Sequence, residues 1–171
     1  MPVTDQHEPC GYSSVRGKYR LLGSMCAATF TRMSTPRLFR VIIPVGDIES
    51  TTGFYATLLG MPGARVSPGR HYFDCGGVTL TLYSPLGDGD PRSPHPNFDH
   101  VYFAVDDLED VHRRAEQLGA LSTHVGDGGL AMGQIATRPW GERSFYLHDP
   151  FGNPLCFVDA RTLFTGRPAS T

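Results

Sequence analysis

The sequence lacks several features that would define its class at once. No apolar run approaches the roughly 20 residues that cross a bilayer. Positive charge is not in excess either, since 15 Lys and Arg face 17 Asp and Glu, for a formal net charge of −2. Nucleic-acid-binding domains usually carry a basic surface. We therefore expect neither a membrane nor a nucleic acid among the partners of this protein.

Cysteine is also scarce. The four cysteines lie far apart and form no Cys-x-x-Cys pair; they are Cys10, Cys26, Cys75 and Cys156. Small secreted proteins with disulfide frameworks have many more cysteines per residue. The spacing favours a protein without disulfides, in the reducing environment of the cytoplasm.

The first 34 residues lack the regular pattern seen later. They combine polar residues, glycines and isolated charges with one apolar stretch, Leu21–Phe30, which is too weak for the core of a signal peptide. We expect residues 1–34 to be a disordered extension. A misassigned start is the other interpretation, because Met33 stands only five residues before the first predicted strand.

From residue 40 onward the sequence repeats itself. The stretches 40–49 (RVIIPVGDIE) and 100–109 (HVYFAVDDLE) lie 60 residues apart and share two valines, an aspartate and a glutamate at matching positions. Farther on, 74–82 (DCGGVTLTL) matches 149–157 (DPFGNPLCF), at a larger offset that places an insertion of about 15 residues in the second copy. A duplication of this kind predicts two modules of the same architecture.

Each copy has the local pattern strand, helix, strand, strand, strand. An alternating strand runs into an aspartate that can cap a helix, Asp47 or Asp107, and a glycine suited to a left-handed C-cap follows, Gly60 or Gly119. The predicted strands are 38–45, 64–67, 70–74 and 78–84 in the first copy, and 100–105, 123–125, 143–148 and 154–159 in the second.

The pattern predicts an α+β protein with a single domain over residues 35–160. Module 1 spans about 38–85, a proline-rich linker covers 86–97, module 2 spans about 98–160, and 161–171 form a C-terminal tail. The glycine-rich segment 126–137 is a candidate lid, with a plain surface insertion as the alternative.

Strand alternation assigns the side chains of each module to two faces. Apolar residues such as Ile43 and Phe103 belong on the helix side and predict the core. The alternate positions put Arg40 and His100 on the opposite face, together with threonines, tyrosines and a cysteine from later strands. Polar groups on a concave sheet face suggest a ligand cleft, whereas a solvated sheet face is the alternative.

Three stretches now resemble one known family. They are 41–48 (VIIPVGDI), the pair Phe54-Tyr55 followed by 58–61 (LLGM), and 140–155 (WGERSFYLHDPFGNPL). Together and in this order they are similar to the vicinal oxygen chelate superfamily, which includes glyoxalase I, bleomycin-resistance proteins and extradiol dioxygenases. The resemblance implies two βαβββ modules whose sheets curve into a cup, with the helices outside and the ligand inside. It also implies a homodimer.

The resemblance also implies where a metal would lie. Glyoxalase-like members supply His, Gln or Glu from four positions, which here are Arg40, Thr81, His100 and Cys156. Only His100 keeps the expected chemistry. A threonine hydroxyl does not ionise readily, and an arginine places a fixed positive charge where a dication would bind. We predict neither a metal nor another cofactor, with a divalent metal in an unusual ligand set as the alternative.

An arginine at this position suggests a different use. A guanidinium on a partly buried face can anchor a carboxylate or phosphate through two parallel hydrogen bonds. Aromatic side chains could then hold a flat ligand body. The predicted ligand-binding residues are Arg40, Ile42, Thr81, Tyr83, His100, Tyr102, Trp140, Tyr146 and Cys156. Against this, Arg40 could instead pair with an acidic residue on the surface, and Trp140 could simply pack at the edge of the cup.

The other polar residues of note are expected to have structural or solvent-exposed roles. Cys156 is expected to be a small, half-buried side chain rather than a nucleophile. Asp149 and Asn153 are expected to form a turn. The surface is the expected place of His71, His95, His112, His124 and His148.

The sequence thus predicts a metal-independent protein that binds a small, possibly anionic and partly aromatic molecule. The first alternative is a lyase, isomerase or epimerase that uses His100 as general base, with or without a divalent metal. The second is a non-catalytic regulatory or scaffolding domain. Fold membership alone does not decide among them.

Overall fold

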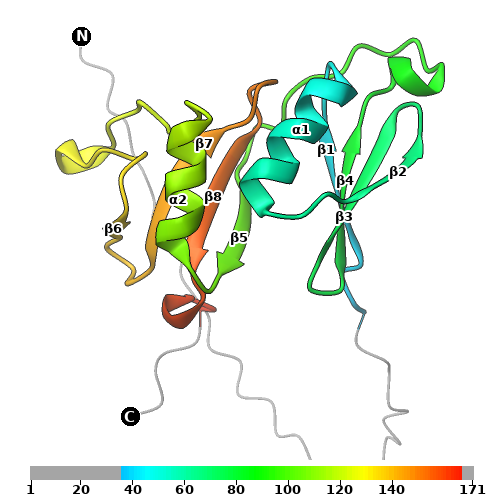
Figure 1. Cartoon of the computed structure of the whole chain (residues 1–171). Coiled ribbons are helices and arrows are strands. Elements are labelled where there is room, and N and C mark those ends of the chain that lie inside the picture. The colour runs from blue at the N-terminus through cyan, green and yellow to red at the C-terminus, as the bar shows by residue number, and fades with distance from the viewer. Residues whose placement is uncertain (1–35, 167–171) are drawn as a thin grey trace, which may run out of the picture. The chain divides into compact units, whose positions relative to one another are not determined.

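The computed structural model describes residues 36–166, in which the same order of elements occurs twice (Figure 1). The first module contains β1 (Arg40–Pro44), α1 (Ile48–Leu59), β2 (Ala64–Ser67), β3 (Arg70–Cys75) and β4 (Val78–Tyr83). The second contains β5 (Val101–Val105), α2 (Leu108–Gln117), β6 (Ala136–Thr137), β7 (Arg143–His148) and β8 (Pro154–Asp159). The predicted extension at 1–34 lies outside the described residues.

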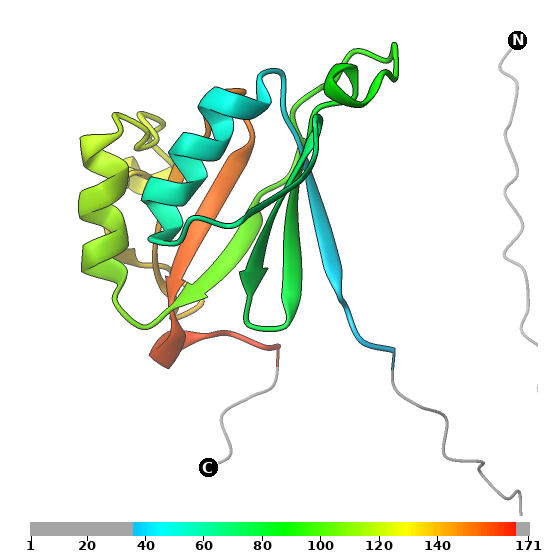
Figure 2. The ribbon, with the colours of Figure 1, turned by 45° about the vertical axis from the view of Figure 1, so that its right-hand side comes forward.

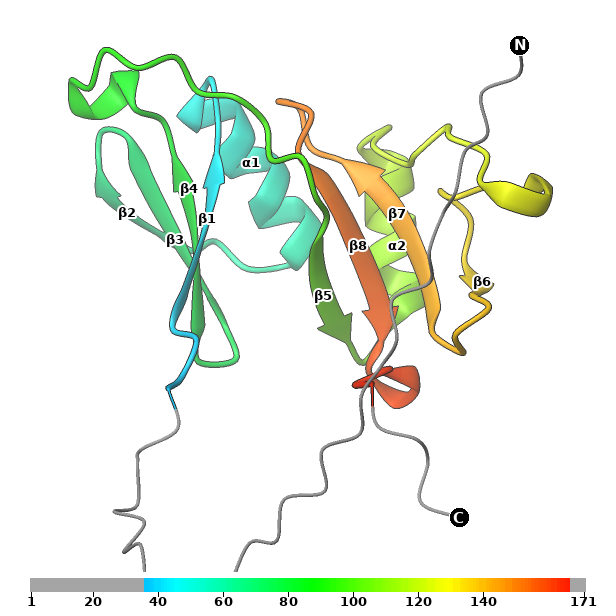
Figure 3. The same ribbon diagram turned by 180° about the vertical axis from the view of Figure 1, so that it is seen from behind.

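Each module folds into its own four-stranded sheet. The strand orders are β1-β4-β3-β2 and β5-β8-β7-β6, and in both sheets the first strand pairs in parallel with the last, while the other pairs are antiparallel. Seen from behind, the sheets are open and twisted, and β1 and β5 each leave one edge unpaired within the described chain (Figure 3). The structure confirms the predicted α+β class and the duplicated βαβββ order.

Both helices begin where the sequence predicts, and α1 also ends there, whereas the C-cap of α2 is Leu118, one residue before the predicted left-handed Gly119. The Asp47 carboxylate accepts hydrogen bonds from the backbone N–H groups of Glu49 and Ser50 at 2.8 and 2.9 Å, and the Asp107 carboxylate accepts one from Asp110 at 2.9 Å. Gly60 ends α1 in the left-handed conformation, with φ 69°. None of the described helices combines the length and the apolar character that a bilayer-spanning segment requires.

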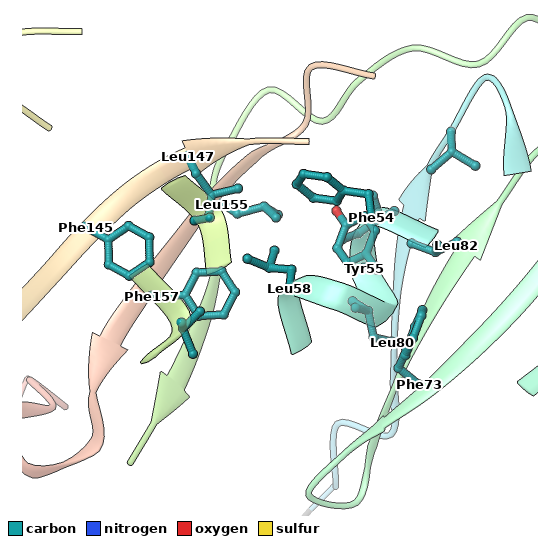
Figure 4. Packing of buried hydrophobic residues seen from close by; sticks show 14 of the residues in the cluster. Phe54, Tyr55, Leu58, Phe73, Leu80, Leu82, Phe145, Leu147, Leu155 and Phe157 are labelled. Carbon is teal, nitrogen blue, oxygen red and sulfur yellow. The ribbon is translucent and has the colours of Figure 1, made fainter. Parts of the chain in front are cut away.

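One hydrophobic core serves both modules. The helices α1 and α2 lie next to each other on the same side of the sheets (Figure 2). Leu58 of α1 is fully buried in a cluster that also contains Leu80 of the first sheet and Phe157 of the second (Figure 4). Because the cluster draws on both sheets, the two modules are stabilised together rather than one by one.

A turn of the second module is hydrogen-bonded to the first. Asp149 is buried and accepts hydrogen bonds from the Phe151 and Asn153 backbone N–H groups, from the Asn153 side chain at 2.7 Å, and from the Tyr55 hydroxyl at 3.0 Å. Asn153 also donates to the Pro44 carbonyl at 2.9 Å. The two residues form the expected turn, and in addition they join β8 to the end of β1 and to α1.

Gly46 allows this turn to approach. A β-carbon placed on Gly46 would lie 2.9 Å from the nearest ring carbon of Phe151, closer than side chains normally approach each other. The Phe151 ring therefore lies directly against the backbone of the segment between β1 and α1. This contact and the hydrogen bonds of Asp149 fix the turn at the same place.

Three expectations about local structure are wrong. Residues 123–125 form no strand; Val125 makes an isolated bridge with Ala131, and the fourth strand of the sheet is the short β6 inside the segment expected to be a lid. His71 is not at the surface either, because its position on β3 points into the module, where the side chain is 6% exposed and Nε2 lies 2.9 Å from the Pro62 carbonyl. His112 is partly buried in the same way, against the Gly133 carbonyl.

Candidate functional site

Each sheet has one face covered by helices and one open face. The open face of the first sheet carries three rows of side chains across β1, β4 and β3, set by the strand register. These rows are Arg40–Thr79–Asp74, Ile42–Thr81–Tyr72 and Pro44–Tyr83–Arg70. The alternation predicted from the sequence is confirmed, since Ile43, Leu80 and Leu82 of the same strands are buried in the core.

Arg40 is held by aromatic rings instead of by a carboxylate. Its guanidinium carbon lies 4.9 Å from the centre of the Phe39 ring and 4.8 Å from that of Tyr72. Within the described part of the chain no ion pair involves this side chain, which is exposed. The alternative interpretation, a surface ion pair of Arg40, is therefore not seen among these residues. The guanidinium is oriented by stacking and keeps its hydrogen-bond donors for solvent or for a ligand.

The other predicted residues of this face are less available. The Tyr83 hydroxyl donates to Asp90 at 3.3 Å, and the Arg70 guanidinium covers its ring at 4.5 Å. Thr81 lies in the middle of the sheet with 2% of its surface exposed, and its hydroxyl has no hydrogen-bond partner among the described residues. Ile42 is half exposed beside it. Arg40 and Ile42 are thus the accessible members of this group.

The open face of the second sheet is filled to a greater extent. The row equivalent to Ile42–Thr81–Tyr72 is Tyr102–Cys156–Tyr146. The His100 ring meets the Tyr146 ring edge-on with centres 4.9 Å apart, and the Arg138 guanidinium carbon lies 4.9 Å from the same ring. Tyr146 is only 4% exposed, so it is enclosed by its neighbours instead of forming a free wall.

Protonation at this face is governed by burial. Burial, reinforced by the neighbouring His148 and opposed by Asp99, lowers the pKa of His100 below its usual 6.5. Burial raises the pKa of the Cys156 thiol to about 11, against the lowering effect of nearby Tyr146, Ser144 and Arg138. Cys156 is fully buried, not half-buried as expected, and it remains a thiol at neutral pH.

Arg138 is a residue of this face that the sequence did not single out. It is 2% exposed, and its guanidinium donates to the Ser144 hydroxyl at 3.0 Å and to the Ser144, Gln134 and Met132 carbonyls. The segment around Met132 is thereby tied to the sheet over Tyr146 and Cys156. In sequence Arg138 stands in a loop between Thr137 and Pro139, and no local signal distinguishes it from a surface arginine.

The four positions that hold a metal in related proteins do not fit a metal here. Thr81 offers a buried neutral hydroxyl and Arg40 a permanent positive charge, so His100 and Cys156 are the two remaining donors. A transition-metal ion such as Zn²⁺ needs three or four N, O or S donors at about 2 Å. Among the described residues, no group of three or more His, Cys, Asp or Glu side chains could hold an ion.

The structure brings the predicted site residues together as two groups, not one. Arg40, Ile42, Thr81 and Tyr83 share the open face of the first sheet, while the second sheet collects His100, Tyr102, Tyr146 and Cys156. Trp140 lies in the loop between β6 and β7, where it lines a pocket together with Tyr102 of the second group. No hydrogen bond, ring contact or pocket in the described chain joins Arg40 to His100.

Two of the cavities lie away from Arg40, whereas another, of about 580 Å³, is lined by its neighbours Phe39, Tyr72, Asp74 and Thr79. An apolar groove with a volume of about 480 Å³ runs between the modules; it is lined by Val41 and Leu80 of the first sheet, Leu58 of α1, and Phe157 and all of β5 in the second module. A second pocket, of about 450 Å³, lies at the C-terminal end of β5 and contains Tyr102 and Trp140. Sequence reasoning did not anticipate the groove, because core and groove residues have the same apolar pattern.

Comparison with known proteins places this geometry in a family. The family model of the glyoxalase/bleomycin resistance protein/dioxygenase superfamily matches residues 37–157. The chain therefore belongs to this superfamily, as the sequence motifs imply. A comparison with curated proteins finds no match.

Solved structures agree on the fold. A glyoxalase/bleomycin resistance protein from Albidiferax ferrireducens is 21% identical with a TM-score of 0.56, over 76% of this chain and 98% of that one. A lactoylglutathione lyase from Agrobacterium tumefaciens is 21% identical with a TM-score of 0.55, over 75% and 96%. An oxidase called ChaP-H2 is 21% identical with a TM-score of 0.57, over 80% and 98%. At such identity the likeness shows a shared fold.

Proposed function

We propose that this protein binds a small organic acid without a metal, with Arg40 as the anchor of its anionic group. The observation that carries the proposal is the state of the Arg40 side chain. Phe39 and Tyr72 hold the guanidinium in place, and no carboxylate of the described chain neutralises it. A preoriented guanidinium binds a carboxylate through two charge-assisted hydrogen bonds.

The neighbours of Arg40 suit the rest of such a ligand. Ile42 and the Tyr72 ring lie in the next row and present apolar surface beside the guanidinium. A carboxylate on a short aliphatic or aromatic body would place its charge on Arg40 and its body on these two side chains. The donor set at Arg40, Thr81, His100 and Cys156 gives no support to a metal-bound substrate.

We also propose that the protein works as a homodimer. In support, β1 and β5 each present an edge that no described residue pairs with, and such edges are usually covered. The groups around Arg40 and His100 are separate within one chain, and a second copy is the simplest source of an opposite wall. Sedimentation at micromolar concentration measures this directly, and a monomer of about 19 kDa would exclude it.

The second candidate function is an enzyme that uses His100 as general base. The observation in its favour is that burial keeps this imidazole neutral at pH 7, as a base must be. Against it, His100 makes no hydrogen bond to a described residue that would orient it. Metal content and turnover of purified protein separate this candidate from the binding protein.

Matched pairs of ligands test the proposal. A thermal-shift screen compares organic acids with their amides, for example benzoate with benzamide, and calorimetry follows on the acids that stabilise the protein. Arg40→Ala should weaken acid binding about tenfold, at the lower end for a charged pair because Arg40 is exposed. Arg40→Lys should recover only part of the affinity, because it keeps the charge but not the planar fork.

A control variant separates local from general charge effects. Arg113→Ala on α2 also removes one positive charge, from an exposed side chain that pairs with Asp110. It should leave acid binding unchanged. If Arg40→Ala binds the acids as tightly as the wild type, Arg40 is not the anchor; if amides stabilise the protein as well as acids do, the ligand is not an anion.

A further inference from the structure

The pocket at the C-terminal end of β5 is built from four parts of the second module. Its volume is about 450 Å³. The floor is apolar and is formed by Ala104 of β5 and Val158 of β8, the latter 2% exposed. The remaining lining residues come from β5, from the loop after β6, and from the segment after the short helix Ala160–Thr162; they are Tyr102, Phe103, Trp140, Glu142, Leu163 and Phe164.

Three aromatic side chains from these separate segments stand around the pocket and remain open to solvent. Trp140 is 45% exposed, Tyr102 56% and Phe164 57%. Single exposed aromatic residues are common, but three that converge on one cavity from distant parts of a chain mark a binding surface. Packing in the chain itself does not account for them, because each ring leaves about half of its surface uncovered.

Glu142 is hydrogen-bonded to two other residues of the pocket, Trp140 and Phe164, and supplies its negative charge. Its carboxylate accepts a hydrogen bond from the Trp140 indole N–H at 2.7 Å and one from the Phe164 backbone N–H at 3.1 Å. It is the one charged residue among the described residues that line the pocket. A carboxylate that accepts from the indole N–H also makes the ring more electron-rich.

The nearby arginines do not cancel this negative charge. Arg143 pairs with Glu109 and, at 3.5 Å, with Asp159, while Arg161 pairs with Asp159 at 2.7 Å. Both guanidinium groups are thus already neutralised outside the pocket. What the pocket offers a ligand is three exposed aromatic rings, an apolar floor and one carboxylate.

We propose that this pocket binds a small organic ammonium ion, with a quaternary ammonium group as the best fit. Ring faces attract a cation through their quadrupole, and the methyl groups of a quaternary ammonium bury apolar surface at the same time. The Glu142 carboxylate adds a full opposite charge. The site is independent of the anion proposed at Arg40, which lies on the other module and shares no residue with it.

The chain contains a built-in reporter for this site. Trp140 is the only tryptophan among the 171 residues, so intrinsic fluorescence monitors the pocket directly. The probes are choline and its uncharged isostere 3,3-dimethylbutan-1-ol, titrated into the full-length protein. Choline should cause a saturable change and bind at least about tenfold more tightly than the alcohol, because the two differ only in charge.

Variants assign the effect to the proposed groups. Glu142→Gln keeps the shape and an acceptor for the indole N–H but removes the charge, and it should weaken choline about tenfold while leaving the alcohol unchanged. Phe164→Leu keeps apolar volume but removes a ring face, and it should weaken choline several-fold. The matched control is Phe98→Leu, because Phe98 is 99% exposed and does not line the pocket.

The outcomes that overturn the proposal are distinct from those that would overturn an anion site at Arg40. Equal binding of choline and the alcohol would mean a merely apolar pocket, and the absence of a saturable signal with both would mean no site. Arg40→Ala should leave the choline titration unchanged. If Glu142→Gln does not fold, as judged by circular dichroism, the comparison of the two probes on the wild type still decides.

Discussion

At equivalent positions of the two modules, a basic side chain contacts a tyrosine ring. In the first, the Arg40 guanidinium lies 4.8 Å from the Tyr72 ring, and in the second, the His100 ring lies 4.9 Å from the Tyr146 ring. The backbone frame is thus repeated, but one group carries a permanent charge and the other a charge that depends on pH. A duplicated fold preserves where side chains meet without preserving what they do.

The central row of each sheet differs more. In the first module the Thr81 hydroxyl is buried without a described partner, whereas in the second Cys156 lies under Tyr146, Met132 and their neighbours. The second module contains the insertion, and Arg138 binds it to the sheet. The comparison indicates that the insertion has turned part of an open sheet face into core, and that the first module keeps the more accessible face.

The largest difference in stability between the two modules should come from the turns at the ends of the equivalent strands β3 and β7. Asp149→Ala should destabilise the protein by about 2–4 kcal/mol, because it leaves the Tyr55 hydroxyl and the Asn153 amide without their buried acceptor. Asp74→Ala, at the matching turn of the first module, should cost less than about 1 kcal/mol, because Asp74 is exposed and accepts only from Gly77 N–H. Urea denaturation of both variants measures the difference.

A milder variant tests the same contact. Tyr55→Phe removes only the hydroxyl that reaches Asp149 and should cost about 1 kcal/mol. Burial and the Asp149 charge raise the pKa of Tyr55 well above its usual value, so the hydroxyl is a donor at neutral pH. Equal losses of stability for Asp149→Ala and Asp74→Ala would contradict the view that this turn stabilises the contact between the two modules.

Substitutions in the central rows of the two sheets should change the stability of the protein in opposite directions. Thr81→Val removes a buried hydroxyl that has no described partner and should stabilise the protein by about 1 kcal/mol. Cys156→Ala should destabilise it by about 1–2 kcal/mol, because it leaves a small cavity beneath Tyr146. Thr79→Val, in the neighbouring row, serves as control and should be near neutral. If Thr81→Val destabilises the protein, the Thr81 hydroxyl has a hydrogen-bond partner outside the described residues.

The smallest effect concerns pH and separates His100 from Arg40. The folded-state pKa of His100 is lowered from 6.5, so its contribution to stability is fully present above pH 6.5 and is lost as the pH falls through 6.5 toward the lower, folded value. The groups that face it are Asp99, Tyr102, Tyr146 and His148. In urea denaturation at pH 5 and pH 8, His100→Gln should show a slightly smaller pH difference than the wild type. Arg40→Gln should leave that difference unchanged, because arginine keeps its charge throughout.

Most of the fold could be predicted because its signals are local. The period of the strands and the caps at Asp47 and Gly60 lie within short stretches. The offset between the two copies follows from the match of two short stretches. The strand at 123–125 was predicted by analogy between the copies, and it fails because the second copy has an insertion there. The burial of His71 also escaped, because alternation assigns a face but does not show what covers it.

The site could be predicted only in part, for a different physical reason. Strand alternation placed Arg40 and His100 on open faces correctly, since that needs only the period of a strand. The burial of Tyr146 and the roles of Arg138 and Glu142 depend on contacts between segments that follow no short-range pattern. Glu142 and Phe164 in particular are 22 residues apart and meet only in the folded chain.

The cage around Arg138 bears on the order in which the second module forms. The guanidinium is desolvated against neutral groups: three carbonyls and a hydroxyl from Met132, Gln134 and Ser144, the Met132 sulfur and the Tyr146 ring. Each acceptor alone repays a small part of the cost of taking this charge out of water. A partly folded state in which only two of these acceptors are in place is therefore less favourable than a state with none or with all of them. We expect the insertion to become ordered in one concerted, late step, once β7 is formed.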